Sequence, residues 1–479
     1  MLKSISLENY KCFKYLNSLD IAPLTILCGV NSSGKSSILK SLLMMKQSYE
    51  KSSATNYMTF NGKYIDNGTF NEIISKNSTG NFFRIGNSFE ITKNTNTKTI
   101  TKDTTSFRDL CRLYYDNRIE KFLINISIDI VNSDGFIYSN EIDTIDISIL
   151  AYKNNQINKS TSIIIKRNRK KYSIKCQDMP DVSGNLGCFE IGSCTCYFSG
   201  MSLKSIYQEG MNESTKLYIP TIVSIYNIIS TQYLQIKYLA PLRDNPQRRY
   251  IADKNVNSVG VTGENTPLLL KKISKMQHWN GIAAPNSEDS IAHLLNNVQR
   301  SNFITLLNSW MNYFDLGNVY LDNCQKELIK IKIGNHNIAD VGFGVSQSLP
   351  ILVEGLNMRP EQTLLLEQPE IHLHPKMQMK VADFLLSLAI QNKQVIVETH
   401  SDHLINRLVR RYMECKELRN KVKIYFVDKN DNGESKIECV HIDEVDGALC
   451  SNPNFFYQFA SETEKIIDAG YKNLKDKNV

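Results

Sequence analysis

The segment Gly29-Val30-Asn31-Ser32-Ser33-Gly34-Lys35-Ser36 is the stretch that decides how this chain folds. It matches the pattern GxxxxGK[ST], in which glycines let the backbone wrap around phosphate groups and point its N–H groups at them. The apolar run 24–28 before it predicts a strand, and residues 36–46 after it have helical spacing, so an anion here would also meet a helix N-terminus. A glycine-rich turn of another kind is the alternative, which this strand–loop–helix context disfavours. The predicted phosphate ligands are Gly29, Asn31, Ser32, Ser33, Gly34, Lys35, Ser36 and Ser37.

A phosphate loop of this kind also predicts a metal ion. Lys35 is expected to reach the β- and γ-phosphates of a nucleotide, and Ser36 is expected to ligate Mg²⁺. The run Thr363-Leu364-Leu365-Leu366-Glu367 reads as an apolar strand that ends in an acid, and such an acid can hold the same Mg²⁺ through water. An ordinary buried strand ending in a polar loop is the alternative. The predicted metal ligands are therefore Ser36 and Glu367.

Two further segments have the residues of an anion site. Residues 340–350 (DVGFGVSQSLP) form a glycine-rich turn that opens an apolar helix, so amides near Gly344, Ser346 and Gln347 can point at an anion. A plain strand–helix turn explains the same pattern equally well. His400 follows a predicted strand at 395–398, where a lone histidine is often structural. His372 and His374 suggest a metal by their spacing, but no third ligand stands near them, which disfavours that interpretation.

Composition places the chain among ordinary globular proteins. It has 479 residues, 42% hydrophobic and 22% charged, and no apolar run approaches the roughly 18 residues that span a bilayer. A cytoplasmic protein without membrane contact is expected. Eleven cysteines are scattered without a disulfide framework, and the irregular spacing of Cys176, Cys188, Cys194 and Cys196 favours free thiols over a zinc site. The net charge of +7 is compatible with nucleic-acid contact and does not decide the partner.

Periodicity along the chain predicts an α/β fold in which a long insertion splits one sheet. Five segments are expected: 1–80, an N-terminal half with the phosphate loop; 81–200, a β-rich continuation; 201–320, a helical insertion; 321–430, a C-terminal half; and 431–479, a small tail domain. Strands are predicted at 5–10, 24–28, 122–131, 143–152, 160–166, 235–241, 363–367, 394–399 and 423–428. Helices are predicted at 36–46, 217–233, 291–314, 376–390 and 402–415.

The order of these motifs resembles the SMC-like branch of the ABC ATPases. The opening Leu7-Glu8-Asn9-Tyr10-Lys11-Cys12-Phe13 and the run at 24–29 are similar to that branch specifically. The chain lacks heptads long enough for a coiled-coil arm, so it resembles compact members of bacterial antiphage systems more than chromosome-organising proteins. Further similarities to the compact group lie at 60–64 (FNGKY), 238–243 (YLAPLR), 367–375 (EQPEIHLHP), 446–448 (DGA) and 455–456 (FF).

This resemblance implies roles for the motifs. It makes ATP with Mg²⁺ the cofactor, and it places residues 340–350 at the signature, which contacts the γ-phosphate bound by a second subunit. It makes His400 the switch histidine and Glu367 the Walker B acid. ABC ATPases normally carry a glutamate after that acid to activate water; here Gln368 stands there, and an amide can orient water but cannot take its proton. Glu370 is the nearby carboxylate that could substitute, so slow hydrolysis is expected.

Among compact members, the best match is PtuA, the ATPase family of the Septu antiphage system, which also accompanies some retrons. The resemblance implies a homodimer of heads or a higher homo-oligomer, an HNH endonuclease partner, and contact with phage or retron DNA. Too few residues follow the His400 helix for a Toprim nuclease domain, so the chain itself is not expected to cut DNA. The leading hypothesis is an ATP-regulated scaffold that controls the nuclease. The alternative is a DNA-repair or DNA-end ATPase that couples hydrolysis to DNA remodelling.

Overall fold

The computed structural model describes most of the chain, with gaps. The described residues are 1–50, 58–76, 78, 80–93, 102–114, 116–132, 141–168, 171–180, 186–194, 196–199, 202–205, 213–251, 255–274, 276, 279–288, 298–325, 328–450 and 467. Phe455 and Phe456, which carry part of the family resemblance, and most of the predicted tail domain lie outside them.

A seven-stranded sheet carries the phosphate loop. Its strand order is β12-β19-β20-β3-β21-β22-β23, parallel from β12 to β21 and antiparallel beyond. The strand β3 (Leu24–Gly29) comes from the start of the chain, whereas β19 (Thr363–Glu367), β20 (Gln394–Glu398) and β21 (Val422–Lys429) come from its last third. The two ends of the chain thus build one sheet around a long insertion, as predicted. The other strands are β12 (Lys237–Leu239), β22 (Ser435–Ile442) and β23 (Leu449–Cys450).

Helices cover both faces of this sheet. On one face, α1 (Lys35–Glu50) shares a hydrophobic core with Leu27, Leu365 and Ile396. On the other face, α8 (Phe343–Asn357) and α9 (Pro375–Ile390) share a second core with the side chains that the same strands direct to that face, among them Ile26 and Leu366. All residues of β19 and β20 are buried, as strands of a parallel sheet covered on both sides must be. The helix that begins at the phosphate loop and the helix that begins at the predicted signature therefore lie on opposite faces.

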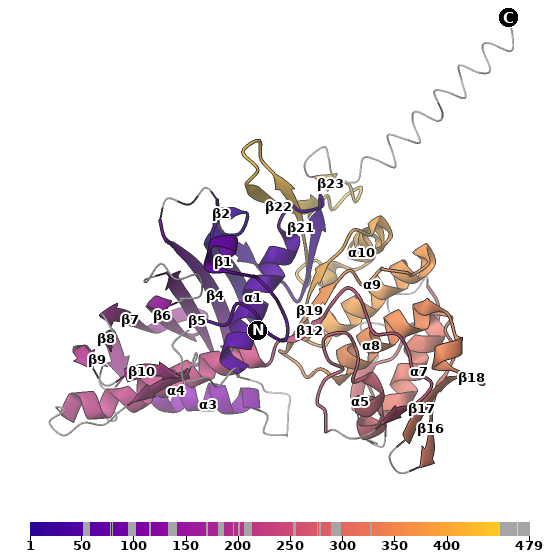
Figure 1. The fold of residues 1–479 in the computed structure, drawn as a ribbon, viewed down its shortest axis with the longest axis horizontal. Coiled ribbons are helices and arrows are strands. Elements are labelled where there is room, and N and C mark those ends of the chain that lie inside the picture. The colour runs from indigo at the N-terminus through magenta and orange to yellow at the C-terminus, as the bar shows by residue number, and fades with distance from the viewer. Residues whose placement is uncertain are drawn as a thin grey trace, which may run out of the picture.

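An eight-stranded antiparallel sheet forms the second layer, in the order β2-β1-β4-β5-β6-β7-β8-β9. Along β5 (Lys121–Val131), buried and half-buried residues alternate, so the sheet places one face on the core that it shares with α1. Figure 1 shows α3 (Lys102–Tyr114) and α4 (Glu213–Leu234) beside this sheet, and α5, α7, α8, α9 and α10 gathered in the other half of the molecule. The remaining strands of the sheet are β1 (Leu2–Tyr10), β2 (Phe13–Asp20), β4 (Phe82–Thr92), β6 (Glu141–Lys153), β7 (Gln156–Asn168), β8 (Lys171–Pro180) and β9 (Leu186–Cys194).

The predicted helix at 291–314 is wrong over part of its length. Residues Val298–Ser301 form the strand β15, which pairs with β14 (Trp279–Ile282), and the helix α7 covers only Phe303–Tyr313. Asn302 ends the strand and caps the helix, because its side chain accepts a hydrogen bond from the backbone N–H of Thr305 at 2.8 Å. Residues 291–297 lie outside the described ones. The spacing of apolar residues within 298–301 could not reveal this strand, since it forms only by pairing with β14, some 20 residues earlier.

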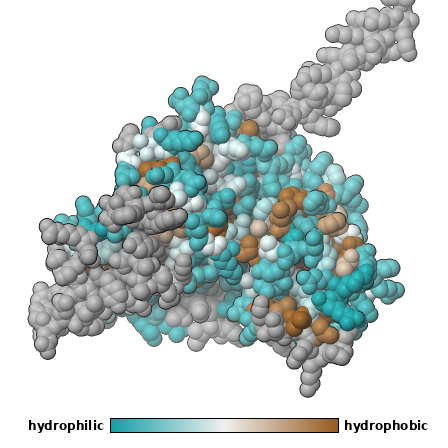
Figure 2. Space-filling view, viewed as in Figure 1, coloured by the Kyte–Doolittle hydropathy of each residue, from teal (hydrophilic) through white to brown (hydrophobic). Residues whose placement is uncertain are grey.

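The other predicted strands and helices occur in the predicted order, but α3, β2, β4 and β8 are among the elements that were not predicted. The helix α10 (Asp402–Glu414) follows β20, and the strand predicted at 235–241 is β12. In the described part of the chain, no helix combines the length and hydrophobicity needed to cross a bilayer. Figure 2 shows a largely hydrophilic face, with small hydrophobic patches over the half that carries α8 and α9. The smaller elements are α2 (Phe70–Ile73), α5 (Thr266–Ile273), β10 (Cys196–Ser199), β11 (Ser202–Ser205), β13 (Tyr250–Ile251), β16 (Val319–Gln325), β17 (Leu328–Ile333), β18 (His336–Asn337), η1 (Ile338–Asp340) and η2 (Lys416–Leu418).

Candidate nucleotide-binding site

The phosphate loop has the backbone that its glycines predict. It leaves β3 at Gly29 with a φ of 132°, passes Gly34 with a φ of 110°, and enters α1 at Lys35. A Cβ at Gly34 would lie 2.6 Å from the Sγ of Cys12, and one at Gly29 would overlap the backbone of Val427. Both positions therefore exclude any larger residue. The strands on either side fix the loop at the carboxyl edge of the sheet, the usual ligand edge of an α/β fold.

Lys35 and the small residues of the loop line this edge. The Nζ of Lys35 donates to the carbonyl oxygens of Gly29 at 3.1 Å and Val30 at 2.6 Å. Burial lowers the pKa of Lys35, and the nearby carboxylate of Glu398 partly opposes that shift. Of the other predicted phosphate ligands, Asn31 and Ser32 are exposed, Ser33 is buried, and Ser36 and Ser37 are half-buried.

Two acids end neighbouring strands next to the loop. Glu367 ends β19, and Glu398 lies opposite it at the end of β20. The hydroxyl of Ser36 donates to Oε1 of Glu398 at 2.9 Å, whereas the hydroxyl of Tyr238 donates to Oε1 of Glu367 at 2.9 Å. Burial, reinforced by the charge of Glu367, raises the pKa of Glu398 to about 7. Burial also raises the pKa of Glu367.

Glu398 and Tyr238 were not among the site residues predicted from the sequence. A signal for Glu398 was present, because a charged residue ends an otherwise apolar strand directly before Thr399 and His400. Tyr238 begins the run 238–243 that carries part of the family resemblance, but that run does not indicate a contact with Glu367, which arises because β12 pairs with β19.

The backbone after Glu367 turns sharply. Gln368 has a φ of 43°, and its N–H donates to the carbonyl oxygen of Glu398 at 2.7 Å. The guanidinium of Arg243 donates to the carbonyl oxygens of Glu367 at 3.1 Å and Gln368 at 3.2 Å. The side chain of Arg243 is buried under this turn, so it is not free to face a phosphate of a partner subunit.

Glu370 holds the segment that carries the predicted switch histidine. Its Oε1 accepts a hydrogen bond from the backbone N–H of His400 at 2.7 Å. Partial burial and the positive charge of Lys35 lower the pKa of His400, so the imidazole lies within electrostatic reach of the phosphate loop. The structure thus brings Lys35, Ser36, Glu370 and His400 to one edge of the sheet.

The signature segment begins α8. Gly342 caps the helix, and Phe343, 62% exposed, lies with its ring centroid 5.9 Å from that of His372. The hydroxyl of Ser346 donates to the carbonyl oxygen of Phe343 at 2.8 Å, and Gln347 is buried. A Cβ on Gly344 would meet Met377 at 3.5 Å, which is ordinary contact. Packing within this chain therefore does not require the glycine at 344.

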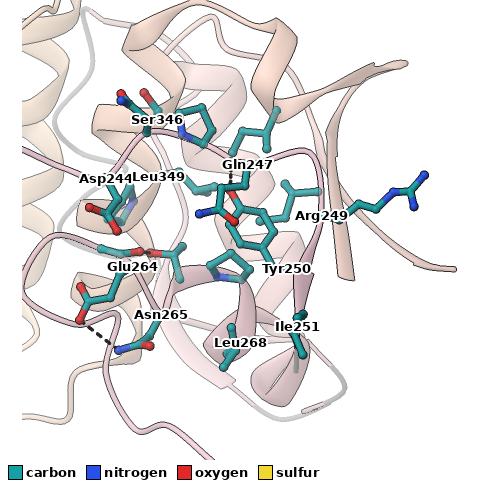
Figure 3. Close-up of a pocket in the computed structure, with 18 residues that line it drawn as sticks. Asp244, Gln247, Arg249, Tyr250, Ile251, Glu264, Asn265, Leu268, Ser346 and Leu349 are labelled. Atoms are coloured by element: carbon teal, nitrogen blue, oxygen red, sulfur yellow. Dashed lines mark hydrogen bonds between the residues drawn. The ribbon is translucent and has the colours of Figure 1, made fainter. Parts of the chain in front are cut away.

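A pocket lies beside the first turns of α8. Its volume is about 420 Å³, and Figure 3 shows Ser346 and Leu349 of α8 facing Asp244, Tyr250 and Glu264 across it. Arg249 points away from the pocket. Arg248, which is mostly exposed, forms an ion pair with Asp340 at 2.5 Å. This loop therefore borders the signature instead of the phosphate loop of the same chain.

The donors near the phosphate loop suit Mg²⁺ bound together with a nucleotide. Within the described residues, no three His, Cys, Asp or Glu side chains form a cluster that could hold a metal without other ligands. Mg²⁺ typically uses one or two carboxylates together with phosphate oxygens and water. Oε2 of Glu398 is enclosed and has no hydrogen-bond partner among the described residues, which fits an oxygen that ligates a cation. When bound, Mg²⁺ would neutralise phosphate charge, and Ser36 with these acids would hold it.

A phosphate loop that leads directly into a helix, with two strand-end acids beside it, is the arrangement of a P-loop ATPase. The sequence matches the model of the AAA ATPase domain family over residues 1–405, and the chain belongs to that family. No curated protein sequence matches it.

Solved structures of SMC heads are among those distantly similar to this chain. The SmcHead bound to the C-winged helix domain of ScpA is 13% identical with a TM-score of 0.39, covering 92% of this chain and 98% of that one. The SMC head domain from Thermotoga maritima is 11% identical with a TM-score of 0.36, covering 92% and 99%. An Smc head with an extended coiled coil, bound to the C-terminal domain of ScpA derived from Pyrococcus furiosus, is 13% identical with a TM-score of 0.37, covering 92% and 96%.

Proposed function

We propose that this ATPase is a nucleotide-dependent clamp, in which each chain supplies the phosphate loop and a second copy supplies the signature. The observation that carries this proposal is the placement of the two segments. The helix α1 packs on one face of the seven-stranded sheet and α8 packs on the other, so the two segments do not meet within one chain. Two-fold pairing of identical heads would give each nucleotide both contacts.

The surface at the start of α8 fits such an approach. A Cβ at Gly342 would have no neighbour within 4 Å, and Gly344 has room for one as well. Glycines that the chain's own packing does not require suit the close approach of another backbone or of a phosphate. Phe343 beside them presents an aromatic ring to solvent, and aromatic residues are enriched at the centres of protein interfaces.

The acid–base groups of the site favour slow hydrolysis, so that bound ATP would persist. Gln368 stands where a general base would be, and an amide cannot accept the proton of the attacking water. Oε1 of Glu370 is already engaged by the backbone of His400. A long-lived closed state would suit a scaffold better than a motor.

The partner class comes from the resemblance to the PtuA family. We infer that the clamp acts in the cytoplasm as part of an antiphage system and keeps an HNH endonuclease partner under the control of ATP. Phage or retron DNA is the proposed nucleic-acid ligand whose binding would trigger the system. This part of the proposal rests on the motifs at 60–64, 238–243 and 367–375.

A complementation experiment tests the clamp. Lys35→Ala removes the main side-chain cation for the phosphates, and Gly344→Asp puts a carboxylate against the γ-phosphate of the other head. We expect each variant alone to lose ATP-dependent pairing in sedimentation velocity. An equimolar mixture should pair again, because a Lys35→Ala chain offers an intact signature to the intact phosphate loop of a Gly344→Asp chain.

The control is Asn357→Asp, which adds the same charge at the other end of α8, about 20 Å away. It should pair like the unmodified protein. If Gly344→Asp pairs normally while binding ATP, or if the mixture fails to pair although both variants fold, the composite site is refuted.

The biological role needs a cellular test. The chain is expressed with an HNH endonuclease encoded beside its gene, and the cells are challenged with phage. We expect protection only when both proteins are present and Lys35 is intact. Equal protection without the nuclease, or sensitivity to DNA damage on deletion without any effect on phage, would favour the DNA-repair alternative.

A further inference from the structure

Glu398 lies directly beside the phosphate loop. Its strand, β20, stands between β3, which leads into the phosphate loop, and β19, which ends in the predicted Walker B acid. The side chain is 5% exposed, and its Oε1 accepts the hydroxyl hydrogen of Ser36 at 2.9 Å. Ser36 is the loop residue expected to ligate Mg²⁺. Glu398 is therefore in direct contact with a predicted metal ligand.

Glu367 is held from the other side. The strand β12 pairs with β19 on the edge away from β3, and from it the hydroxyl of Tyr238 donates to Oε1 of Glu367 at 2.9 Å. The two acids therefore have different partners: Tyr238 donates a hydrogen bond to Glu367, and Ser36 of the phosphate loop donates one to Glu398.

The second oxygen of Glu398 is unsatisfied. Among the described residues, no donor reaches its Oε2, although that atom is shielded from solvent. An enclosed carboxylate oxygen without a partner is costly, and such atoms often mark an ion site. A divalent cation beside Ser36 would satisfy this oxygen and neutralise the two neighbouring acids.

We propose that Glu398, more than Glu367, is the carboxylate that holds the Mg²⁺ of the bound nucleotide, directly or through water, together with Ser36. Glu367 then acts as a supporting acid that Tyr238 orients. This inference rests on the proposed function, because it assigns the metal that accompanies ATP. It also moves a role predicted for β19 to the adjacent strand.

Two isosteric variants test the assignment. Glu398→Gln and Glu367→Gln each remove one charge and keep the side-chain shape. The affinity for a fluorescent ATP analogue is measured in Mg²⁺ and again in EDTA, and the ratio of the two affinities gives the contribution of the metal. We expect Glu398→Gln to reduce this ratio about 10–100-fold, the range typical when a residue next to a metal is lost. Glu367→Gln should reduce it clearly less.

Binding in EDTA separates this inference from the proposed function. If the unmodified protein binds no nucleotide in either condition, the proposed function fails first. If it binds ATP normally and Glu398→Gln leaves the ratio unchanged, or changes it no more than Glu367→Gln, the assignment to Glu398 is overturned. Circular dichroism confirms folding. Should Glu398→Gln not fold, Glu398→Asp withdraws the carboxylate by one methylene, and an unchanged ratio in that variant overturns the assignment as well.

Discussion

Replacing Asp383 by asparagine should destabilise the half of the protein that carries the signature. Asp383 lies on α9, is fully buried, and accepts hydrogen bonds from Arg407 Nη2 at 2.8 Å, Arg411 Nε at 2.7 Å and the Tyr313 hydroxyl at 2.6 Å. Arg407 and Arg411 are buried as well and come from α10. The carboxylate therefore joins the helix after the Walker B strand to the helix after the switch histidine.

The expected loss of stability depends on the buried positive charge that the substitution leaves without a carboxylate. Removing one partner of a buried ion pair typically costs about 3–5 kcal/mol, because the remaining charge is desolvated and uncompensated. Arg411 keeps an ion pair with Glu414 at 2.6 Å, so Arg407 is the guanidinium that loses most. We therefore expect a loss of about 3 kcal/mol in the free energy of unfolding, the lower end of that range.

Intrinsic fluorescence can follow this region selectively. Trp310 is fully buried, and its ring lies 5.0 Å from that of Phe384, the neighbour of Asp383 in sequence. The chain has one other tryptophan, so urea unfolding in a Trp279→Phe background reports on this core. Asp322→Asn is the control, because its ion pair with Lys332 at 3.0 Å is exposed and such pairs contribute about 0–1 kcal/mol. If Asp383→Asn costs no more than Asp322→Asn, the reasoning about the buried network is refuted.

Three further changes have defined outcomes. Gln368→Glu should raise steady-state phosphate release by about 10²-fold or more, since it restores a general base; turnover of many per second in the unmodified protein would contradict this. Gly34→Ala should weaken ATP binding at least about tenfold, because the new Cβ would lie 2.6 Å from Cys12 Sγ at a residue with a φ of 110°. The control Gly334→Ala, which has open space around its Cβ, should leave ATP binding unchanged. Burial lowers the pKa of Lys393 from 10.5 to about 7, so above pH 7 the unfolded state retains a proton that the folded state has lost. The stability of the unmodified protein relative to Lys393→Met should then rise above pH 7 and approach a slope of about 1.4 kcal/mol per pH unit between about pH 8 and 9 in urea titrations. A flat difference would contradict the shift.

Much of the fold was predictable because the decisive signals are local. The strand–loop–helix around Lys35 has a fixed spacing of glycines and a clear change from apolar run to helical period. The strands β19 and β20 are apolar along their whole length, and the structure has them within a residue of the prediction. Alternation of such strands with helices predicts a parallel sheet. Residues 298–301 were mispredicted because pairing with a strand some 20 residues earlier overrode their local spacing.

The sequence by itself predicted the phosphate loop and placed Gln368 directly after the strand-end acid Glu367, because both depend on residue types at fixed spacings. Only the tertiary structure decided which side chains meet across strands. Strand order places Glu398 between the loop and Glu367, and it brings Tyr238 to Glu367 from 129 residues away. It also buries Arg243 beneath the turn that follows Glu367. Side chains at strand ends become neighbours through sheet pairing, and no local pattern encodes which strand lies beside which.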